Sequence, residues 1–221
     1  MKKITAIRAG RGRGKRVNVF LDGKFAFSLE AEVAVKEDLQ VGQELSVGQI
    51  EALARSDHFH RCLNAAAHYL SYRPRSESEL RERLYRRGFG DDSVEAVIAK
   101  IKEQGLVDDT AFAQFWKDNR ESFSPRSQWL TRLELRRKGI AKEIIDQVVD
   151  VIDDDESAYR AALSKARGLP QSDYQSFRRR LGGYLRRRGF SYEVINHTVE
   201  LMWQEVLSLS PTVESSQQKR G

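Results

Sequence analysis

Apolar residues recur along the chain with the spacing of an α-helix, and they do so three times at nearly equal intervals. Each time they stand at offsets 0, 3, 4 and 7, which places them on one face of a helix. The three stripes are Val94, Val97, Ile98 and Ile101, then Ile145, Val148, Val149 and Ile152, then Ile195, Thr198, Val199 and Met202. Only Thr198 is not apolar. The pattern predicts one amphipathic helix in each of three repeats.

A short motif stands before each stripe. It consists of a leucine, three mostly basic residues, a glycine and a large apolar residue, and its glycines are Gly88, Gly139 and Gly189. The repeat length is therefore 51 and then 50 residues. A basic last turn followed by glycine is typical of a helix that ends in a left-handed residue. A repeat of roughly fifty residues is too long for two helices, so we expect a third helix in each.

Residues 1–28 show an alternating pattern instead. Val17, Val19 and Leu21 alternate with other side chains, and Asp22-Gly23 is a typical two-residue hairpin turn. A segment near Ile4 is a further candidate strand. The sequence predicts a small antiparallel β-unit, which must pack on a helix or a partner because an isolated hairpin is barely stable.

The predicted fold class is mainly α: three tandem three-helix repeats that form an elongated, curved array, with a small N-terminal β-hairpin unit. The predicted segments are the hairpin and a short helix (1–46), repeat 1 (47–105), repeat 2 (106–153), repeat 3 (154–209) and a disordered tail (210–221). The short helix lies within residues 29–40, the next helix begins near Val47, and the last one ends near Leu209.

Helix starts follow from capping residues. We predict N-caps at Ser76, at Asp91 or Asp92, at Ser124 with Pro125 in the first turn, and at Ser172 in a capping box with Gln175. We expect Phe112, Phe115 and Trp116 to be core residues of a helix that ends near Arg120. The helix after Gly139 is predicted to run to Ile152. We favour Trp129 as a core residue over an exposed stacking residue. Gly182-Gly183 indicates either close helix packing or a hinge.

Positive charge is concentrated around the three motifs. The net charge is +6, and residues 73–89, 120–140 and 172–190 carry +3, +4 and +5. The rest of the chain is therefore net acidic. Basic helices that recur once per repeat can line one surface if the repeats stack, which indicates a polyanionic partner.

Composition narrows the class of protein further. Charged residues make up 32% of the chain, and the sequence contains no apolar run of about 18 residues that would predict a membrane span. No secretory signal is visible at the start, and Cys62 is the single cysteine. These features favour the cytoplasm.

Searches for catalytic or metal motifs give only weak candidates. The segment Gly10–Arg16 lacks the glycine spacing and the Ser or Thr of a phosphate loop, so a basic connecting loop is favoured. His58, His60, Cys62 and His68 invite a zinc site, but they lack paired-cysteine spacing. Asp153–Glu156 is better explained as the N-terminal turn of a helix than as a metal site. We expect no enzyme, no cofactor and no metal.

Several of these motifs together resemble one family. The string Arg75-Ser76-Glu77-Ser78-Glu79-Leu80, then Leu84-x-x-Arg87-Gly88-Phe89, Leu106-x-Asp108-Asp109-x-x-Phe112-Ala113 and Glu134-Leu135-x-x-Lys138-Gly139-Ile140 is similar to the RecX family of bacterial recombination regulators. The N-terminal hairpin resembles an extension of some members. One departure is Arg126-Ser127, where the family pattern has a basic residue followed by glycine.

The resemblance implies three tandem three-helix units and a protein that binds the groove of the RecA–DNA filament. There it would inhibit RecA ATPase, filament growth and strand exchange, and so modulate homologous recombination, DNA repair and the SOS response. It also implies contacts to the backbone of single- and double-stranded DNA. We expect a monomer without a membrane partner.

The candidate RecA- and DNA-binding residues lie on the basic helix faces. They are Arg75, Arg81, Arg86, Arg87, Arg126, Arg132, Arg136, Arg137, Lys138, Arg179, Arg186 and Arg187. For any single arginine, a solvated helix face with a glutamate one turn away is an equally good interpretation. Two other functions stay open: a helical regulator that binds DNA directly, and a nuclease with an acidic metal site near Asp153–Glu156.

Overall fold

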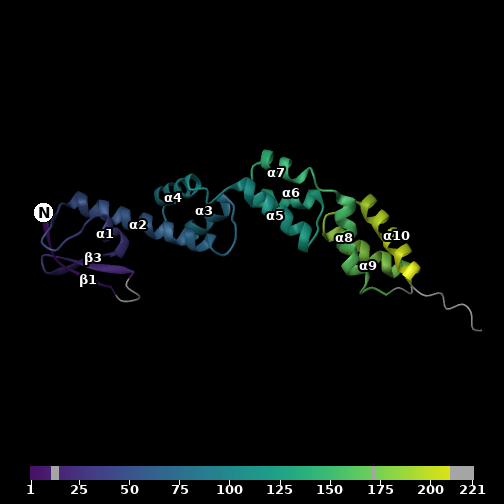
Figure 1. Cartoon of the computed structure of the whole chain (residues 1–221), viewed down its shortest axis with the longest axis horizontal. Coiled ribbons are helices and arrows are strands. Elements are labelled where there is room, and N and C mark those ends of the chain that lie inside the picture. The colour runs from purple at the N-terminus through teal and green to yellow at the C-terminus, as the bar shows by residue number, and fades with distance from the viewer. Residues whose placement is uncertain (11–14, 171–172, 210–221) are drawn as a thin grey trace, which may run out of the picture. The chain divides into compact units, whose positions relative to one another are not determined.

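The computed structural model describes residues 1–10, 15–170 and 173–209. The predicted tail, Ser172 and most of the Gly10–Arg16 loop lie outside these residues. The described residues form ten helices and four strands (Figure 1). Their contacts divide the chain between Asp108 and Asp109 into two units, and each is described by itself.

The first unit begins with a four-stranded antiparallel sheet. Its strands are β1 (Lys2–Ala9), β2 (Arg16–Leu21), β3 (Lys24–Glu30) and β4 (Glu44–Leu45), in the order β3-β2-β1-β4. Asp22 and Gly23 both have positive φ, at 50° and 79°, as the tight turn between β2 and β3 requires. The predicted hairpin is therefore confirmed, whereas the two-residue strand β4 carries no sequence signal of its own.

Two helices cover this sheet: α1 (Ala31–Lys36) and the first half of α2 (Val47–Leu70). Leu53 of α2 packs with Val33 of α1 on the strand residues Ile4 and Val19. Buried Asp57 accepts hydrogen bonds from the Glu30 amide at 2.6 Å and from Arg16 at 3.3 Å. Figure 1 shows α2 continuing from the sheet into the next bundle, so one helix belongs to both cores.

Repeat 1 consists of the second half of α2, α3 (Glu77–Arg86) and α4 (Asp91–Glu103). Its core contains Cys62 and Ala66 from α2, Leu80 and Leu84 from α3, and the apolar stripe of α4. Burial raises the pKa of the Cys62 thiol to about 11, so the thiol stays protonated at neutral pH.

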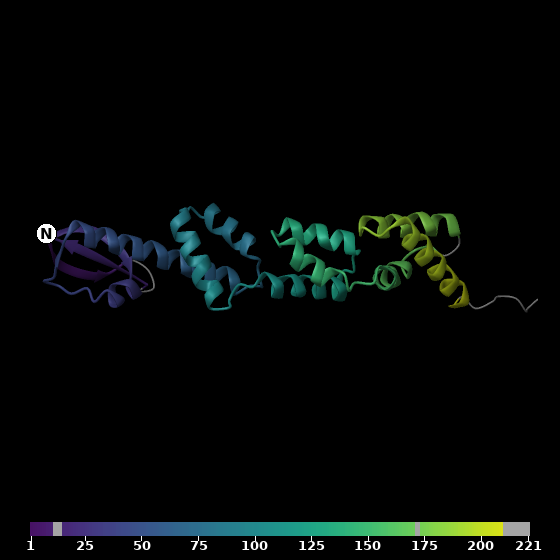
Figure 2. The same cartoon turned by 90° about the horizontal axis from the view of Figure 1, so that it is seen from above.

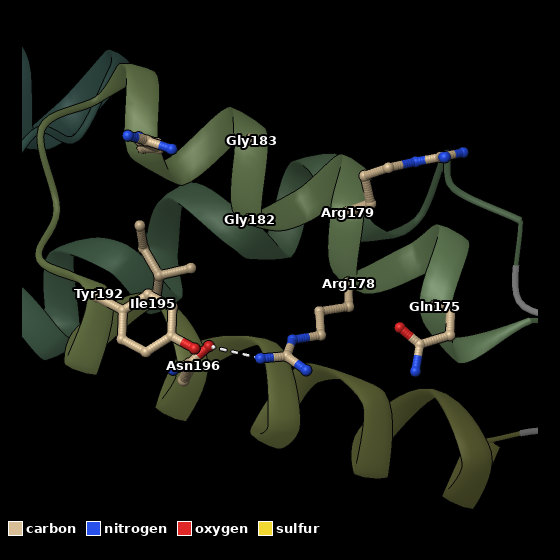
Figure 3. Close-up of a pocket in the computed structure, with 9 residues that line it drawn as sticks. Gln175, Arg178, Arg179, Gly182, Gly183, Tyr192, Ile195 and Asn196 are labelled. Carbon is tan, nitrogen blue, oxygen red and sulfur yellow. Dashed lines mark hydrogen bonds between the residues drawn. The ribbon is translucent and has the colours of Figure 1, made fainter.

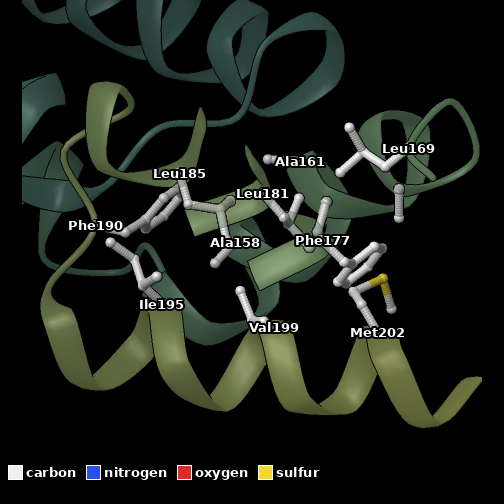
Figure 4. Close-up of a cluster of buried hydrophobic side chains, with 12 residues drawn as sticks. Ala158, Ala161, Leu169, Phe177, Leu181, Leu185, Phe190, Ile195, Val199 and Met202 are labelled. Carbon is white, nitrogen blue, oxygen red and sulfur yellow. The ribbon is translucent and has the colours of Figure 1, made fainter. Parts of the chain in front are cut away.

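The second unit contains repeats 2 and 3. Repeat 2 consists of α5 (Asp109–Phe123), α6 (Gln128–Arg137) and α7 (Lys142–Val149). Repeat 3 consists of α8 (Asp154–Ala166), α9 (Tyr174–Arg187) and α10 (Tyr192–Leu209), green to yellow in Figure 2. Figure 4 shows the core of repeat 3, in which Phe177, Leu181 and Leu185 of α9 meet α10.

All twelve positions of the three predicted stripes are buried, including Thr198. The fold is thus mainly helical, with an N-terminal sheet followed along the chain by three three-helix repeats, as the periodicity predicts. Ile152 is buried although α7 ends at Val149, which is earlier than predicted.

The three predicted glycine turns share one hydrogen-bond pattern. Gly88, Gly139 and Gly189 have φ of 88°, 76° and 86°. After each glycine the next amide donates to a leucine carbonyl five residues earlier: Phe89 to Leu84, Ile140 to Leu135, and Phe190 to Leu185. The glycine amide itself donates to the carbonyl three residues before it. These are Schellman motifs, and each joins a basic helix to the helix that carries the apolar stripe.

Several predicted helix starts are wrong. Gly90 precedes α4, so Asp91 and Asp92 lie in its first turn rather than at the cap. Ser127, not Ser124, caps α6, because α5 continues to Phe123 and the buried Ser127 hydroxyl accepts from the Leu130 amide. Ser76 caps α3 as predicted, and Asp173, the second residue of the predicted capping box, caps α9.

Two aromatic residues predicted as core are exposed. Trp129 is 63% exposed, since α6 buries Thr131 and Leu135 and thus turns Trp129 outward. Phe115 is 36% exposed, while its neighbours Phe112 and Trp116 are buried and partly buried. The helices α5 and α6 pack against their neighbours on one side only, so rings that lie beside the buried face remain exposed.

Gly189 also forms the contact between repeats 2 and 3. A Cβ at this position would lie 2.6 Å from Ser127 Oγ and 2.7 Å from Leu130 Cβ. The Ser127 amide donates to the Arg188 carbonyl at 3.1 Å, and the Arg188 guanidinium donates to Ser124 and Pro125. At Gly88 the same Cβ would meet no atom within 4 Å. The two glycines therefore share a backbone conformation but differ in their surroundings.

We expect the two glycines to respond differently to alanine. Gly88→Ala adds only left-handed strain and lowers the free energy of unfolding by about 1 kcal/mol. Gly189→Ala adds a steric overlap with α6 and lowers it by about 3 kcal/mol. Urea denaturation followed by circular dichroism measures both. Equal losses of unfolding free energy in the two variants would show that the close approach at Gly189 does not contribute to stability.

Candidate functional site

The basic helices α3, α6 and α9 hold the predicted binding residues, and the structure separates these residues by what they contact. One group forms ion pairs inside its own repeat. A second group packs on aromatic rings. A third group is exposed and makes no ion pair with the residues that the structure describes.

Arg81 and Arg132 belong to the first group. Arg81 on α3 donates to Glu95 on α4 at 2.7 Å and also pairs with Glu77, and these hydrogen bonds raise its pKa, that to Glu95 most strongly. Arg132 on α6 pairs with Asp146 on α7 at 2.5 Å and with Asp150. Each of these arginines bridges the second and third helix of its repeat.

Arg126 also has an internal partner. It pairs with Glu134, which further accepts hydrogen bonds from Arg120 and from the Trp116 indole, both at 2.8 Å. Desolvation lowers the pKa of the Arg126 guanidinium. Glu134 thereby joins α5 to α6. Its partner Arg126 therefore has a structural role in repeat 2.

Aromatic rings hold the cation at the end of each basic helix. Arg87 lies 6.0 Å from the Tyr69 ring centre, Lys138 4.9 Å from that of Trp116, and Arg188 4.5 Å from that of Tyr184. These contacts attract a cation to the π-face of the ring. The motif of each repeat thus ends in a cation whose side chain is oriented by an aromatic ring.

Tyr69 has the densest set of such neighbours. Arg75 and Arg83 lie 5.8 and 4.9 Å from its ring centre, and Arg87 donates to its hydroxyl at 3.4 Å. The hydrogen bond from Arg87 contributes most to lowering the pKa of Tyr69. Burial lowers the pKa of Arg75, whose Nε donates to the Tyr69 carbonyl. This cluster has no signal in the sequence, because Tyr69 lies on α2 outside the basic segments.

The exposed group consists of the last turns of α6 and α9 and one residue in the middle of α9. Within the described residues none of them forms an ion pair, and the set is Arg136, Arg137, Arg179, Arg186 and Arg187. Arg86 on α3 is also exposed, but it pairs with Glu82 one turn earlier. The exposed cations are therefore the ones available to a polyanion.

The weak metal candidates have other roles in the structure. Cys62 is buried in the core of repeat 1, and the His58 ring packs edge-on against Phe89. Asp153 caps α8 by accepting from the amides of Asp155 and Glu156, as the dipole interpretation predicts. Among the described residues, no three His, Cys, Asp or Glu side chains are placed to hold a metal ion.

None of the helices in the described ranges is both long enough and apolar enough to span a bilayer.

Family models match four parts of the chain. They describe the N-terminal domain of regulatory protein RecX (residues 2–46) and the first, second and third three-helix domains of RecX (residues 62–100, 108–149 and 153–199). The regulatory protein RecX of Bacillus pumilus (strain SAFR-032) is 30% identical over 203 residues, covering 90% of this chain and 77% of that protein. This chain belongs to the RecX family.

Other RecX proteins agree with this assignment. The regulatory protein RecX of Clostridium botulinum (strain Eklund 17B / Type B) is 29% identical over 206 residues, with 90% and 96% of the two chains covered. A crystal structure of regulatory protein RecX superimposes with a TM-score of 0.65 at 29% identity, covering 90% of this chain and all of that one. RecX from Lactobacillus salivarius shares the fold, with a TM-score of 0.56 at 23% identity over 66% of this chain and 97% of that one.

The division of the RecX arginines predicts different effects on stability. Arg132→Ala removes a bridge between α6 and α7, because Asp146 and Asp150 both lose their ion pair with the guanidinium. We expect a loss of about 1 kcal/mol in unfolding free energy. Arg136→Ala on the exposed side should change it by less than about 0.5 kcal/mol. Urea denaturation of both variants checks this, and a large loss for Arg136→Ala would contradict the division.

Proposed function

We propose that this RecX protein regulates the RecA recombinase by binding in the groove of the RecA–DNA filament. Bound there, it lowers the ATPase activity of RecA, filament growth and strand exchange, and so modulates recombination, DNA repair and the SOS response. The observation that supports this most directly is that the last turns of α6 and α9 carry exposed arginines which make no ion pair with the described residues.

The physical basis is electrostatic. A recombinase filament contains a phosphate backbone, and arginine pairs well with both phosphate and carboxylate because its planar guanidinium donates two parallel hydrogen bonds. Neutralising phosphates releases counterions, so the affinity should fall steeply with salt. The C-terminal glycine turn keeps each basic turn at the end of its helix, where the side chains spread outward.

The cations with internal partners stabilise the repeats rather than contact RecA or DNA. Arg81, Arg126 and Arg132 hold the helices of repeats 1 and 2 together, and Lys138 lies on Trp116. The contacts to RecA and DNA are then made mainly by Arg136, Arg137, Arg179, Arg186 and Arg187. The protein acts as a binding regulator rather than an enzyme, in the cytoplasm and as a monomer.

A helical regulator that binds DNA directly is the second candidate. The repeated feature of its binding helices is positive charge, which fits contacts to the DNA backbone rather than base readout. This function would not require RecA. The two candidates therefore differ in whether DNA-dependent RecA activity responds to the protein.

Charge reversal on α6 tests the proposal. We expect wild-type protein to inhibit the DNA-dependent ATPase of RecA at substoichiometric amounts. The variant Arg136→Glu/Arg137→Glu should need about tenfold more protein for half-inhibition, because two favourable ionic contacts become repulsive. The assay is ATP hydrolysis by RecA on single-stranded DNA.

A matched control separates contact from net charge. Arg55→Glu/Arg61→Glu makes the same charge change at exposed positions of α2, outside the basic helices, and should inhibit as the wild type does. Unchanged inhibition by the α6 variant would refute the assignment of these arginines. If wild-type protein binds DNA but leaves the ATPase unaffected, the direct DNA-binding regulator is the better function.

A further inference from the structure

One ion pair recurs at equivalent positions of repeats 1 and 2. Arg81 on α3 bonds Glu95 on α4 at 2.7 Å. A shift of 51 residues, the spacing of the first two glycine turns, leads from this pair to Arg132 and Asp146, which bond at 2.5 Å. In both repeats the pair closes the same face between the second and third helix.

Repeat 3 has lost both members of this pair. A shift of 50 residues leads from Arg132 to Gly182 and from Asp146 to Asn196. The guanidinium is replaced by a hydrogen atom and the carboxylate by a neutral amide. Glu200, equivalent to Asp150, lines a separate depression beside Trp203. The position that the bridge fills in repeats 1 and 2 is therefore open in repeat 3.

A cavity occupies this place. It has a volume of about 420 Å³ and lies between α9 and the start of α10 (Figure 3). Its nine lining residues include no acid, and three of them are arginines: Arg178, Arg179 and Arg186. Figure 3 shows Arg178 lying between the two helices and pointing to Asn196, whose Oδ1 accepts a long hydrogen bond of 3.4 Å.

Close packing does not require the two glycines of this cavity. A Cβ on Gly182 would lie 3.5 Å from Ile195 Cγ2, an ordinary contact, and one on Gly183 would meet only the end of the Arg187 side chain at 3.7 Å. The helix α9 continues through both residues. Each glycine costs about 1 kcal/mol relative to alanine in a helix. What the glycines provide is space beside a group of cations.

We infer that this cavity is a binding site for single-stranded nucleic acid, in which the arginines hold a backbone phosphate and Tyr192 stacks on a neighbouring base. Arg178 and Arg186 supply charge from two turns of α9, and Asn196 and Gln175 supply amide groups. The side chain of Tyr192 is 74% exposed at the edge of the cavity. A positively charged groove with an exposed aromatic ring is the usual arrangement for single strands.

An acidic protein segment is the competing occupant of such a site. Guanidinium groups bind carboxylates as well as phosphates. An exposed aromatic ring beside them can stack on a base, but it makes no such contact with a carboxylate. The inference rests on the proposed function in one respect: the strand bound here would be that of the recombinase filament. The site itself can be tested on DNA without RecA.

Rebuilding the missing bridge tests the site without changing the net charge. Gly182→Arg/Asn196→Asp recreates the pair of repeat 2 and fills the cavity. Binding is measured by fluorescence anisotropy with a fluorescein-labelled oligo(dT) at several salt concentrations. We expect the affinity to fall about tenfold, and the slope of log affinity against log salt to become shallower by about 0.7, because one phosphate contact is lost.

Two further variants make the result specific. Gly48→Arg/Asn64→Asp makes the same substitutions at exposed positions of α2, where a Cβ on Gly48 meets nothing within 4 Å, and should bind as the wild type does. Tyr192→Ala removes the ring from an exposed position without disturbing the core. It should weaken binding about tenfold, since stacking contributes this much per base.

Three outcomes would overturn the inference. The first is an unchanged affinity and salt slope for both Gly182→Arg/Asn196→Asp and Tyr192→Ala. The second is no measurable binding of oligo(dT) by the wild type. The third is competition by oligo-glutamate that is as strong as competition by unlabelled oligo(dT). The last result would assign the cavity to a carboxylate-bearing partner. None of them bears on RecA inhibition by the wild type, so the proposed function and this inference fail separately.

Discussion

The hydrogen bond from the amide after each glycine to the leucine carbonyl five residues earlier is the constraint on which each repeat depends. It forms only if the glycine adopts a left-handed conformation, which glycine does readily. Once formed, it ends the basic helix at a fixed residue and directs the chain into the helix that carries the apolar stripe. The leucine and the apolar residue of the motif then enter one core, as Leu185 and Phe190 do in repeat 3.

The same turn determines where the charge can go. The three mostly basic residues before the glycine occupy the last helical turn, where they oppose the partial negative charge of the helix C-terminus. The leucine of the motif is buried, so basic residues that follow it, such as Arg136 and Arg186, face solvent. Internal carboxylates then decide which cations stay available. Repeats 1 and 2 use Arg81 and Arg132 to join two helices, whereas repeat 3 has neither the arginine nor the acid at these positions.

Features governed by periodicity and by glycine could be predicted from the sequence, because they depend on local geometry. The three stripes, the three glycine turns and the hairpin at Asp22-Gly23 are of this kind. The cap of α6 could not, since Ser124 and Ser127 both suit an N-cap and the end of α5 decides between them. The exposure of Trp129 follows from the orientation of α6, which buries Thr131 and Leu135 and leaves Trp129 facing solvent.

The candidate site shows the same limit. The basic segments are visible in the sequence, but the ion pairs between helices that separate structural from available arginines are not. Arg132 and Asp146, for example, are 14 positions apart. The aromatic partners Tyr69, Trp116 and Tyr184 lie on different helices in different repeats. Arg81, Arg132 and Gly182 occupy equivalent positions by the repeat spacing alone. Only the structure shows that the two arginines at these positions bridge helices.

Electron cryomicroscopy of RecA filaments assembled on single-stranded DNA with this protein would show whether the protein binds in the filament groove. We expect density for the three-helix repeats inside the filament groove, with the last turns of α6 and α9 facing DNA phosphates or RecA carboxylates. Density along the outer face of the filament, with these turns directed to solvent, would contradict it. Filaments that lack the protein under conditions where it inhibits RecA would contradict binding in the groove as well.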